Sequence, residues 1–257
     1  MGQHFLAGES WQHRILASLP RDEDATWIEI GAGHGEMTRL LAARCQRLIA
    51  IEADLGLAQS LQEAQQRHPE EWRGVEIVTG NVLKMDLAEL AGRRFRVYGS
   101  LPYYITSPIL HLLFSCAEKL KSAHIVIQRE VAERIAARPG NRGYAYLSAA
   151  SQFYMQPEIA FRIPPGAFRP PPRVTSALVN MTVPGERALL EIADEAGFLK
   201  FVQACFSHKR RTLRNNLQAI ASTQSIRDAL AGSGLRPDAR AEQLSLSAFA
   251  SLFSRLV

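Results

Sequence analysis

The segment "GSLPYYI", residues 99–105, contains residue types suited to methylating an amine attached to a ring. Such an amine is a poor nucleophile because its lone pair is delocalised, and two hydrogen-bond acceptors would pull the nitrogen towards tetrahedral geometry. The side chain of Ser100 and a backbone carbonyl at Leu101 or Pro102 can supply these acceptors. Pro102 stiffens the loop, and Tyr103 offers an aromatic face for an extruded base. A turn followed by a core aromatic would contain the same residue types, so the loop alone leaves both interpretations open.

The segment "IEIGAGHGEMT", residues 28–38, predicts a turn that holds a cofactor. Gly31 and Gly33 allow the backbone to turn tightly and to approach a ligand without a Cβ atom in the way. Glu52 follows Gly31 by 21 residues, at the end of the next predicted strand. A carboxylate in that place can accept hydrogen bonds from both hydroxyls of a ribose.

Glu36, directly after the glycines, distinguishes between two cofactors. A dinucleotide would place its pyrophosphate against this carboxylate, and its fingerprint is G-x-G-x-x-G instead of the G-x-G-x-G found here. S-adenosylmethionine has no phosphate and carries a sulfonium cation, so we expect this cofactor, with a dinucleotide or an empty turn as alternatives. Asn81 can pair with the cofactor's adenine ring or simply form a turn. Glu29 is either structural or an acid that orients the cofactor.

Short apolar segments alternate with helical periodicity over most of the chain. This alternation predicts an α/β fold with a parallel, doubly wound sheet. The expected strands cover residues 26–30, 47–53, 75–80, 95–100, 123–128 and about 174–183. The expected helices between them cover residues 35–44, 55–67 and 107–117.

The Pro-rich segment "IPPGAFRPPPRV" breaks this alternation just before the last expected strand. From Gly185 onward only helical periodicity is found. We therefore expect a domain boundary near Pro184, with an α/β domain over residues 1–184 and a small helical, RNA-binding domain over residues 185–257.

The net charge of +5 is unevenly distributed. Residues 168–257 contain 12 Lys and Arg but 7 Asp and Glu, which accounts for all of it. This end of the chain is therefore expected to face a polyanion such as RNA, although a solvated basic surface would have the same composition.

The segment "FSHKRRTLRNNL", residues 206–217, predicts an amphipathic helix with an RNA-binding cationic face. Its basic residues are Lys209, Arg210, Arg211 and Arg214. Arg210 and Arg214 would share one face of this helix because they are four residues apart. A solvated charged face is the alternative.

The Pro-rich loop adds Arg169 and Arg173 near the ligand edge of the predicted sheet, where we expect them to contact RNA. Phe168 in the same loop either stacks on a flipped base or pins the loop.

The composition argues against several classes of protein. No run of roughly 18 apolar residues is present to span a membrane, and the first ten residues lack the basic and apolar regions of a secretory signal. Cys45, Cys116 and Cys205 are far apart and odd in number, which indicates a reducing compartment and gives no zinc spacing. We expect a cytoplasmic protein with no metal and no membrane partner.

Taken in order, the motifs resemble the KsgA family, the small-subunit ribosomal RNA adenine dimethyltransferases. The segments that carry the resemblance are "GQHFL" (2–6), "IEIGAGHGEMT" (28–38), "IEAD" (51–54), "GSLPYYITSPIL" (99–110), "IQREVAERI" (127–135), "PPGAFRPPPRVTSALV" (164–179) and "HKRRTLRNNL" (208–217). The resemblance implies a Rossmann-like domain that uses S-adenosylmethionine, followed by a small all-helical domain. It also implies transfer of two methyl groups to N6 of each of two adjacent adenines near the 3′ end of small-subunit (16S) rRNA. The expected partner is the immature small ribosomal subunit, and the enzyme is expected to be a monomer.

The same resemblance implies which residues line the cofactor and target pocket: Gln3, His4, Leu6, Gly31, Gly33, Glu52, Asn81 and Ser100. His4 and Ser100 stand where the family usually has Asn, and Asn81 stands where Asp is frequent. Serine is shorter than asparagine and offers a hydroxyl in place of an amide carbonyl, so we expect a functional but slow loop. Two other functions stay open: a ribosome-assembly factor with little or no methylation, and a methyltransferase of large-subunit rRNA.

Overall fold

The computed structural model of the chain describes residues 4–22 and 24–257, which form two compact units. The first unit comprises the chain up to Ala132 together with Glu158–Val183. The second comprises Glu133–Pro157 and Pro184–Val257. Each unit has its own apolar core.

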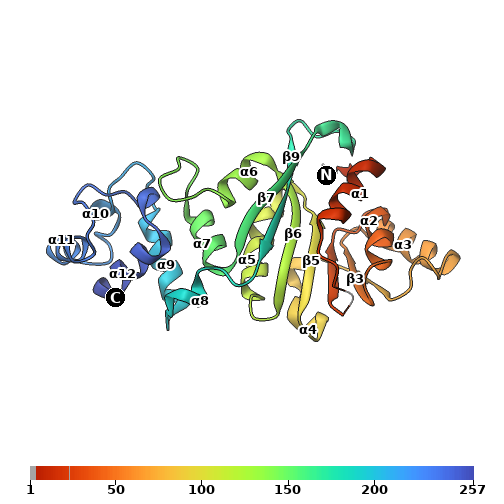
Figure 1. Cartoon of the computed structure of the whole chain (residues 1–257), viewed down its shortest axis with the longest axis horizontal. Coiled ribbons are helices and arrows are strands. Elements are labelled where there is room, and N and C mark those ends of the chain that lie inside the picture. Colours follow the sequence, from red (N-terminus) through yellow and green to blue (C-terminus); the bar gives the residue numbers. More distant parts are fainter. Residues whose placement is uncertain (1–3, 23) are drawn as a thin grey trace. The chain divides into compact units, whose positions relative to one another are not determined.

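The first unit is built on a seven-stranded sheet with the order β4-β3-β2-β5-β6-β9-β7 (Figure 1). The strands are β2 (Thr26–Ile30), β3 (Arg47–Glu52), β4 (Val75–Thr79), β5 (Phe95–Ser100), β6 (Leu120–Gln128), β7 (Gln156–Ile163) and β9 (Ser176–Thr182). From β4 to β6 each strand runs parallel to its neighbour, whereas β9 runs antiparallel to β6. The expected Rossmann-like α/β fold is confirmed, but the sheet is mixed and not wholly parallel.

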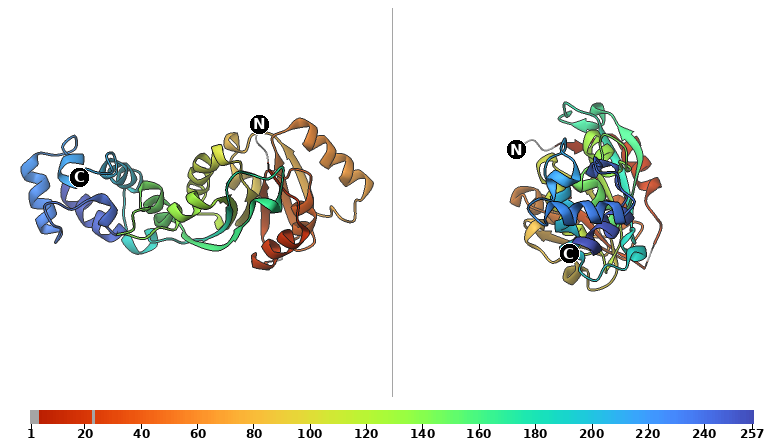
Figure 2. Two further views of the ribbon diagram at one scale, coloured as in Figure 1. Left: turned by 90° about the horizontal axis from the view of Figure 1, so that it is seen from above. Right: turned by 90° about the vertical axis from the view of Figure 1, so that its left-hand side faces the viewer.

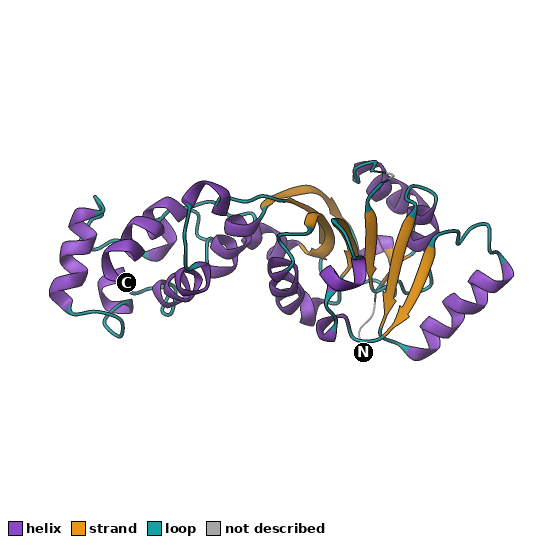
Figure 3. Ribbon diagram, turned by 90° about the horizontal axis from the view of Figure 1, so that it is seen from below, coloured by secondary structure: helices purple, strands orange, loops and turns teal. Residues whose placement is uncertain are grey.

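Helices pack along this sheet (Figure 3). They are α1 (Glu9–Ser18), α2 (Glu36–Ala42), α3 (Leu55–Arg67), α4 (Leu87–Ala91), α5 (Thr106–Ser115) and α6 (Arg129–Ile135), of which the last spans the end of the first unit. Asp54 starts α3 by accepting hydrogen bonds from the amides of Gly56 and Leu57. Among the helices that the structure describes, none has the length and apolarity needed to cross a membrane.

Several elements were not expected from the sequence: α1, α4, α6, β7, and a two-stranded sheet of β1 (Phe5–Leu6) with β8 (Phe168–Arg169). Strand β7 lies at the edge of the main sheet, and every second residue along most of it is exposed. Its charged and polar positions therefore give it a weaker apolar signal than the central strands. Strands β1 and β8 have two residues each and owe their pairing to tertiary contacts.

The direction in which successive strands are added to the sheet reverses between β2 and β5, near the centre of the sheet. From β2 the chain continues through β3 to β4 on one side and then through β5 to β6 on the other. Ile30 of β2 is paired with Gly99 of β5, so both strands end at the same edge. Ligands of open α/β sheets bind at such a switch point, in the crevice at the carboxyl ends of the strands.

The second unit contains α7 (Tyr146–Tyr154), α8 (Arg187–Leu190), α9 (Glu195–Cys205), α10 (Leu213–Asn216), α11 (Thr223–Gly232) and α12 (Leu246–Leu256) (Figure 2). From Pro184 onward it is helical, as expected. Its core also contains Phe153 of α7, whose ring centroid lies 5.3 Å from that of Phe198 of α9. Residues 133–157 thus pack with this core, although the sequence placed them in the first domain.

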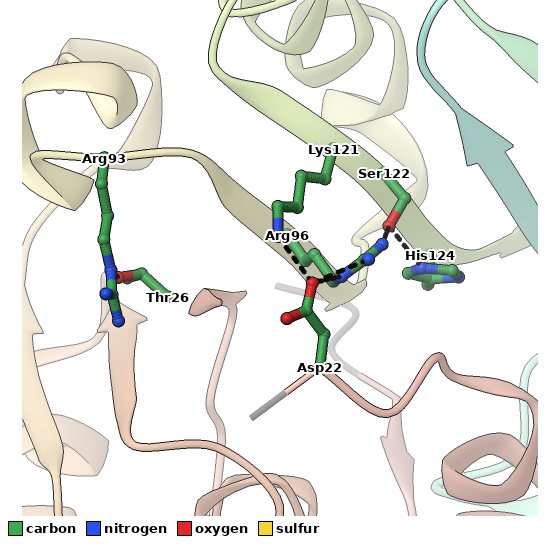
Figure 4. A network of polar contacts seen from close by, with 7 residues as sticks. All are labelled: Asp22, Thr26, Arg93, Arg96, Lys121, Ser122 and His124. Carbon is green, nitrogen blue, oxygen red and sulfur yellow. Dashed lines mark hydrogen bonds and ion pairs between the residues drawn. The ribbon is translucent and has the colours of Figure 1, made fainter. Parts of the chain in front are cut away.

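At the opposite edge of the sheet from the switch point, Asp22 connects the starts of β5 and β6 (Figure 4). Its Oδ2 accepts hydrogen bonds from Lys121 Nζ at 2.7 Å and Arg96 Nη2 at 2.9 Å. Arg96 also donates to Ser122 Oγ, which lies 2.8 Å from Nε2 of the buried His124. Burial lowers the pKa of His124 to about 4, and the Arg96 guanidinium adds to this effect. His124 is therefore neutral at physiological pH and donates from Nδ1 to Asn180 Oδ1.

We predict that Asp22→Asn destabilises the protein at pH 7 by about 1–3 kcal/mol, because two cations lose a shared charged acceptor. The hydrogen bond from Lys121 is the largest of the interactions that hold the pKa of Asp22 below its usual 3.8. A lowered folded pKa gives stability that is fully present above 3.8 and is lost as pH falls through the folded value.

Denaturant unfolding of both proteins from pH 7 downwards checks this prediction. The difference between them should stay constant to about pH 4 and narrow only below it. Asp24→Asn, which removes an exposed carboxylate two residues away, serves as the matched control. Equal losses in the two variants would show that the Asp22 pairs add nothing specific.

Candidate active site

One cavity of about 750 Å³ opens at the carboxyl ends of β2, β3 and β5. The structure brings most of the sequence-predicted residues to its wall: His4, Leu6, Gly31, Gly33, Glu52, Asn81, Ser100, Leu101, Pro102, Tyr103 and Phe168. Gln3 lies outside the described residues. Arg169 and Arg173 do not line the cavity. The separate roles given to these residues stay predictions.

The glycine turn after β2 has a backbone that side chains would strain. Gly31 and Gly33 have φ angles of +77° and +59°, in the left-handed region. The Gly31 amide donates to the Ile51 carbonyl at 2.9 Å, which ties the turn to β3. A Cβ atom on Gly33 would lie 3.0 Å from the ring of Phe5. The turn is therefore closely packed on one side and open to the cavity on the other.

Glu52, at the end of β3, is held in place by backbone amides. Its Oε2 accepts from the Gly33 amide and its Oε1 from the Asp54 amide, each at 2.9 Å. The side chain is only 3% exposed, yet it lines the cavity. Each carboxylate oxygen can accept a second hydrogen bond, so Glu52 presents a fixed pair of acceptors to a ligand.

Asn81 serves the local turn and can also contact a ligand. Its Oδ1 accepts from the Leu83 amide at 3.0 Å and caps the short 3₁₀-helix Val82–Lys84. Asn81 therefore forms a turn through its Oδ1 atom, which is one of the two interpretations that the sequence left open. The side chain is exposed and lines the cavity, so its amide nitrogen and a second lone pair of Oδ1 are available there.

The loop that is predicted to be catalytic leaves β5 at Ser100 and forms the 3₁₀-helix Tyr103–Ile105. The Leu101 amide donates to Val126 of β6, and the Ile105 amide donates to the Pro102 carbonyl. Among the described residues, the Ser100 hydroxyl and the Leu101 carbonyl have no hydrogen-bond partner. Two acceptors on adjacent residues are therefore free at the cavity.

Strands β1 and β8 close one side of the cavity. Leu6 is paired with Phe168, and the Ala7 amide donates to the Ala167 carbonyl at 2.9 Å. His4 donates from Nδ1 to the Pro170 carbonyl at 2.7 Å, so its imidazole is committed to the Pro-rich loop. Phe168 is 2% exposed and belongs to the apolar core, so it pins this loop while its surface lines the cavity.

Similarity to known proteins identifies the family of the chain and its enzyme class. The ribosomal RNA adenine dimethylase family matches residues 1–257. The chain belongs to this family. It is also 40% identical to the ribosomal RNA small subunit methyltransferase A of Acidobacterium capsulatum, with 100% of this chain and 90% of that protein covered. The enzyme class and the family expected from the sequence are thereby confirmed.

Two solved structures share this fold. The crystal structure of the 23S rRNA methyltransferase ErmE has a TM-score of 0.74 and 26% identity, and the alignment covers 98% of this chain and 99% of that one. A dimethyladenosine transferase from Plasmodium falciparum has a TM-score of 0.79 and 21% identity, with 97% and 96% covered.

The wall of the cavity also contains two buried polar side chains that lie next to each other on β2 and β5. Glu29 and Tyr98 are paired in register, line the cavity and are 2% and 1% exposed. Burial raises the pKa of Glu29 to about 8, and it raises the pKa of Tyr98 as well. Oε2 of Glu29 and the Tyr98 hydroxyl have no hydrogen-bond partner in the described protein. The sequence left the role of Glu29 open and gave no signal for Tyr98, because neither motif spacing nor periodicity reports an unpaired buried oxygen.

The predicted amphipathic helix over residues 206–217 is wrong. Helix α9 ends at Cys205 and α10 begins at Leu213, so the basic residues between them lie on a loop. Asn216 causes this break, because its Nδ2 donates to the carbonyl of Cys205 at 2.7 Å and to that of His208 at 3.2 Å. The Leu213 amide is likewise bound to the Ala239 carbonyl.

The basic loop, defined here as residues 207–212, presents Arg210 and Arg211 as exposed side chains. Lys209 is exposed too, but its Nζ donates to the Arg142 carbonyl at 2.8 Å. Arg214 follows on α10, half-buried, and does not continue a helical face from Arg210. The loop is thus cationic as expected, with a different geometry.

The two arginines of the Pro-rich loop are both exposed, and their contacts with RNA stay predictions. The Arg169 guanidinium donates hydrogen bonds to two backbone carbonyls of its own loop, that of Phe168 at 3.1 Å and that of Gly166 at 3.4 Å. It is therefore partly occupied by its own loop. Arg173 is exposed, away from the cavity wall.

Proposed function

We propose that this chain uses S-adenosylmethionine to dimethylate N6 of two adjacent adenines near the 3′ end of small-subunit rRNA, within the immature small subunit. The observation that carries the proposal is a single cavity with two different halves. One half has the glycine turn and the fixed carboxylate of Glu52. The other has two free acceptors, at Ser100 and Leu101, beside the ring of Tyr103.

The cofactor half fits S-adenosylmethionine better than a dinucleotide. Glu52 offers paired acceptors for ribose hydroxyls, and Asn81 offers an amide for the adenine ring. Glu36 also lines the cavity, at the start of α2, where a pyrophosphate would otherwise bind. When bound, S-adenosylmethionine supplies an electrophilic methyl group on a sulfonium.

The loop half is suited to holding an exocyclic amine. The Ser100 hydroxyl and the Leu101 carbonyl can accept one hydrogen bond each from the two N–H groups, which directs the nitrogen lone pair away from the ring. The Pro102 carbonyl is less available because it already accepts from Ile105. After one methylation only a single N–H remains, so the second transfer depends on one acceptor.

The target base would lie between aromatic surfaces. The Tyr103 hydroxyl is 3.2 Å from Ser176 Oγ, and its ring centroid is 5.9 Å from that of His4. This ring is therefore held in one orientation at the cavity wall. Phe168 lines the same cavity, so a flipped adenine can contact both rings.

Small-subunit rRNA is favoured over large-subunit rRNA by the relatives. The chain is 40% identical to a protein named for the small subunit and 26% identical to the 23S enzyme ErmE. We expect the enzyme to act in the cytoplasm, where ribosomes are assembled. We also expect the enzyme to be a monomer.

We predict that Glu52→Ala weakens binding of S-adenosylmethionine by roughly 1–3 kcal/mol, the value of hydrogen bonds to a charged acceptor. Titration calorimetry measures this directly, with Glu63→Ala on the exposed face of α3 as control. Tighter binding of NAD than of S-adenosylmethionine by the parent protein would contradict the cofactor assignment.

We predict that Arg210→Ala/Arg211→Ala weakens rRNA binding and flattens its salt dependence. Each lost phosphate contact should remove roughly 0.7 from the log–log slope for single-stranded RNA. Affinity for S-adenosylmethionine should not change. The charge-matched control is Lys200→Ala/Arg227→Ala, which removes two exposed cations outside the basic loop. If both double variants show the parent slope, the basic loop is only a solvated surface.

We predict that Ser100→Asn speeds methylation by about 10- to 150-fold, because one hydrogen bond to the amine is worth roughly 1.5–3 kcal/mol when well placed. The longer side chain should also shift the product from mono- to dimethyladenosine. Single-turnover reactions on immature small subunits, resolved by mass spectrometry, give both quantities. Ser100→Ala, which has no acceptor, should be slower than the parent.

Two outcomes would contradict this view of Ser100. Full-rate dimethylation by the parent, with no gain from Ser100→Asn, would show that serine is an equal substitute. Subunit binding without methylation by either protein would favour the assembly-factor function instead.

A further inference from the structure

Tyr104 combines two properties that no other aromatic residue of the described chain combines. Its side chain is 74% exposed, and it is the one aromatic residue among the large apolar side chains that are exposed there. It also lines the cavity, beside Ser100 and Tyr103. An exposed aromatic ring at the mouth of a substrate cavity is in contact with water until a ligand covers it.

The neighbouring Tyr103 does not share this freedom. Its hydroxyl contacts Ser176 and its ring faces His4, so it is already part of the cavity wall. Both tyrosines lie in the 3₁₀-helix Tyr103–Ile105, where successive side chains point about 120° apart. Tyr104 therefore points away from the surface that Tyr103 covers.

The backbone under Tyr104 is held on both sides. Before it, the Pro102 carbonyl accepts from the Ile105 amide at 3.2 Å. After it, α5 begins at Thr106, which is 3% exposed, and continues with the fully buried Ile109 and Leu110. Because the backbone is already fixed, only the few side-chain torsions of the tyrosine lose freedom when its ring stacks on a base.

We propose that Tyr104 stacks on the nucleotide that flanks the target adenine and so holds the RNA strand at the mouth of the cavity. This inference rests on the proposed function. Extruding the adenine separates it from its neighbour and exposes the face of that neighbour. The ring of Tyr104 is placed on the same loop as the amine acceptors and replaces the lost stacking partner.

The position of Tyr104 favours RNA over the cofactor as its ligand. The cofactor half of the cavity is built at the ends of β2 and β3, around Gly33 and Glu52. Tyr104 instead follows β5, four residues after Ser100. If Tyr104 covered the cofactor instead, the affinity for S-adenosylmethionine would depend on Tyr104. The Kd of S-adenosylmethionine for each variant distinguishes this alternative.

The experiment uses immature small subunits whose rRNA carries 2-aminopurine directly beside the pair of target adenines and outside it, introduced by ligating a synthetic 3′ segment. The full-length parent, Tyr104→Ala and Tyr104→Phe are compared. The measured quantities are KM and kcat for subunits, 2-aminopurine fluorescence in the complex, and the Kd of S-adenosylmethionine. Leu189→Ala removes an equally prominent apolar side chain, 83% exposed, in the other unit and serves as control.

We expect Tyr104→Ala to raise KM for subunits by about 5- to 150-fold, the range for losing one base–aromatic stack. The parent should quench 2-aminopurine, and Tyr104→Ala should not. Tyr104→Phe and Leu189→Ala should match the parent, and the Kd of S-adenosylmethionine should be the same in all four proteins.

Three results would each overturn the inference. These are an unchanged KM and unchanged quenching in Tyr104→Ala, a Tyr104→Phe variant as impaired as Tyr104→Ala, or weaker binding of S-adenosylmethionine by Tyr104→Ala. Absence of methylation by the parent would instead refute the proposed function. Quenching by the parent then still reports whether Tyr104 contacts the flanking base.

Discussion

The hydrogen-bonded pairing of β2 with β5 is the constraint on which the rest of the site depends. The register Ile30 to Gly99 brings the glycine turn and Ser100 to adjacent positions at one edge. A Cβ atom on Gly31 would lie 3.9 Å from the Ser100 carbonyl oxygen, so the two loops are nearly in contact. The predicted cofactor turn and the predicted amine acceptors thus come from neighbouring strands. A slip of one residue would turn the side chains of the slipped strand towards the wrong face.

Much of this arrangement could be predicted from the sequence. The central strands are continuous apolar segments because both faces of the sheet are covered, and such segments give a strong signal. Glu52 could be located because its spacing from Gly31 follows from one strand–helix–strand unit. The same logic could not reveal β7, whose exposed positions alternate with half-buried ones, or the antiparallel direction of β9. Periodicity reports how deeply a residue is buried and not which strand it joins.

The basic loop shows a second limit of sequence reasoning. Residues 206–217 do have the spacing of an amphipathic helix. The side chain of Asn216, however, binds two backbone carbonyls that would accept hydrogen bonds from helical amides if the helix were continuous. The placement of residues 133–157 in the second unit depends in the same way on contacts such as that of Phe153 with Phe198. These partners are far apart in sequence, so local propensity does not identify them. For the same reason the unpaired oxygens of Glu29 and Tyr98 became visible only in three dimensions.

The side of the cavity formed by β1 and β8 brings together two segments that are far apart in the sequence. His4 and Pro170 are 166 positions apart, and 25 residues of the second unit, Glu133–Pro157, lie between the two halves of the first. A ribosome that has synthesised the five parallel strands β2 to β6 has therefore produced the glycine turn and Ser100 but not the side of the cavity that encloses them. Contacts of such high sequence separation form late. A nascent or prematurely terminated chain that lacks Phe168–Arg169 would thus keep an open, water-filled site, and the cavity could be enclosed only after this strand has been made.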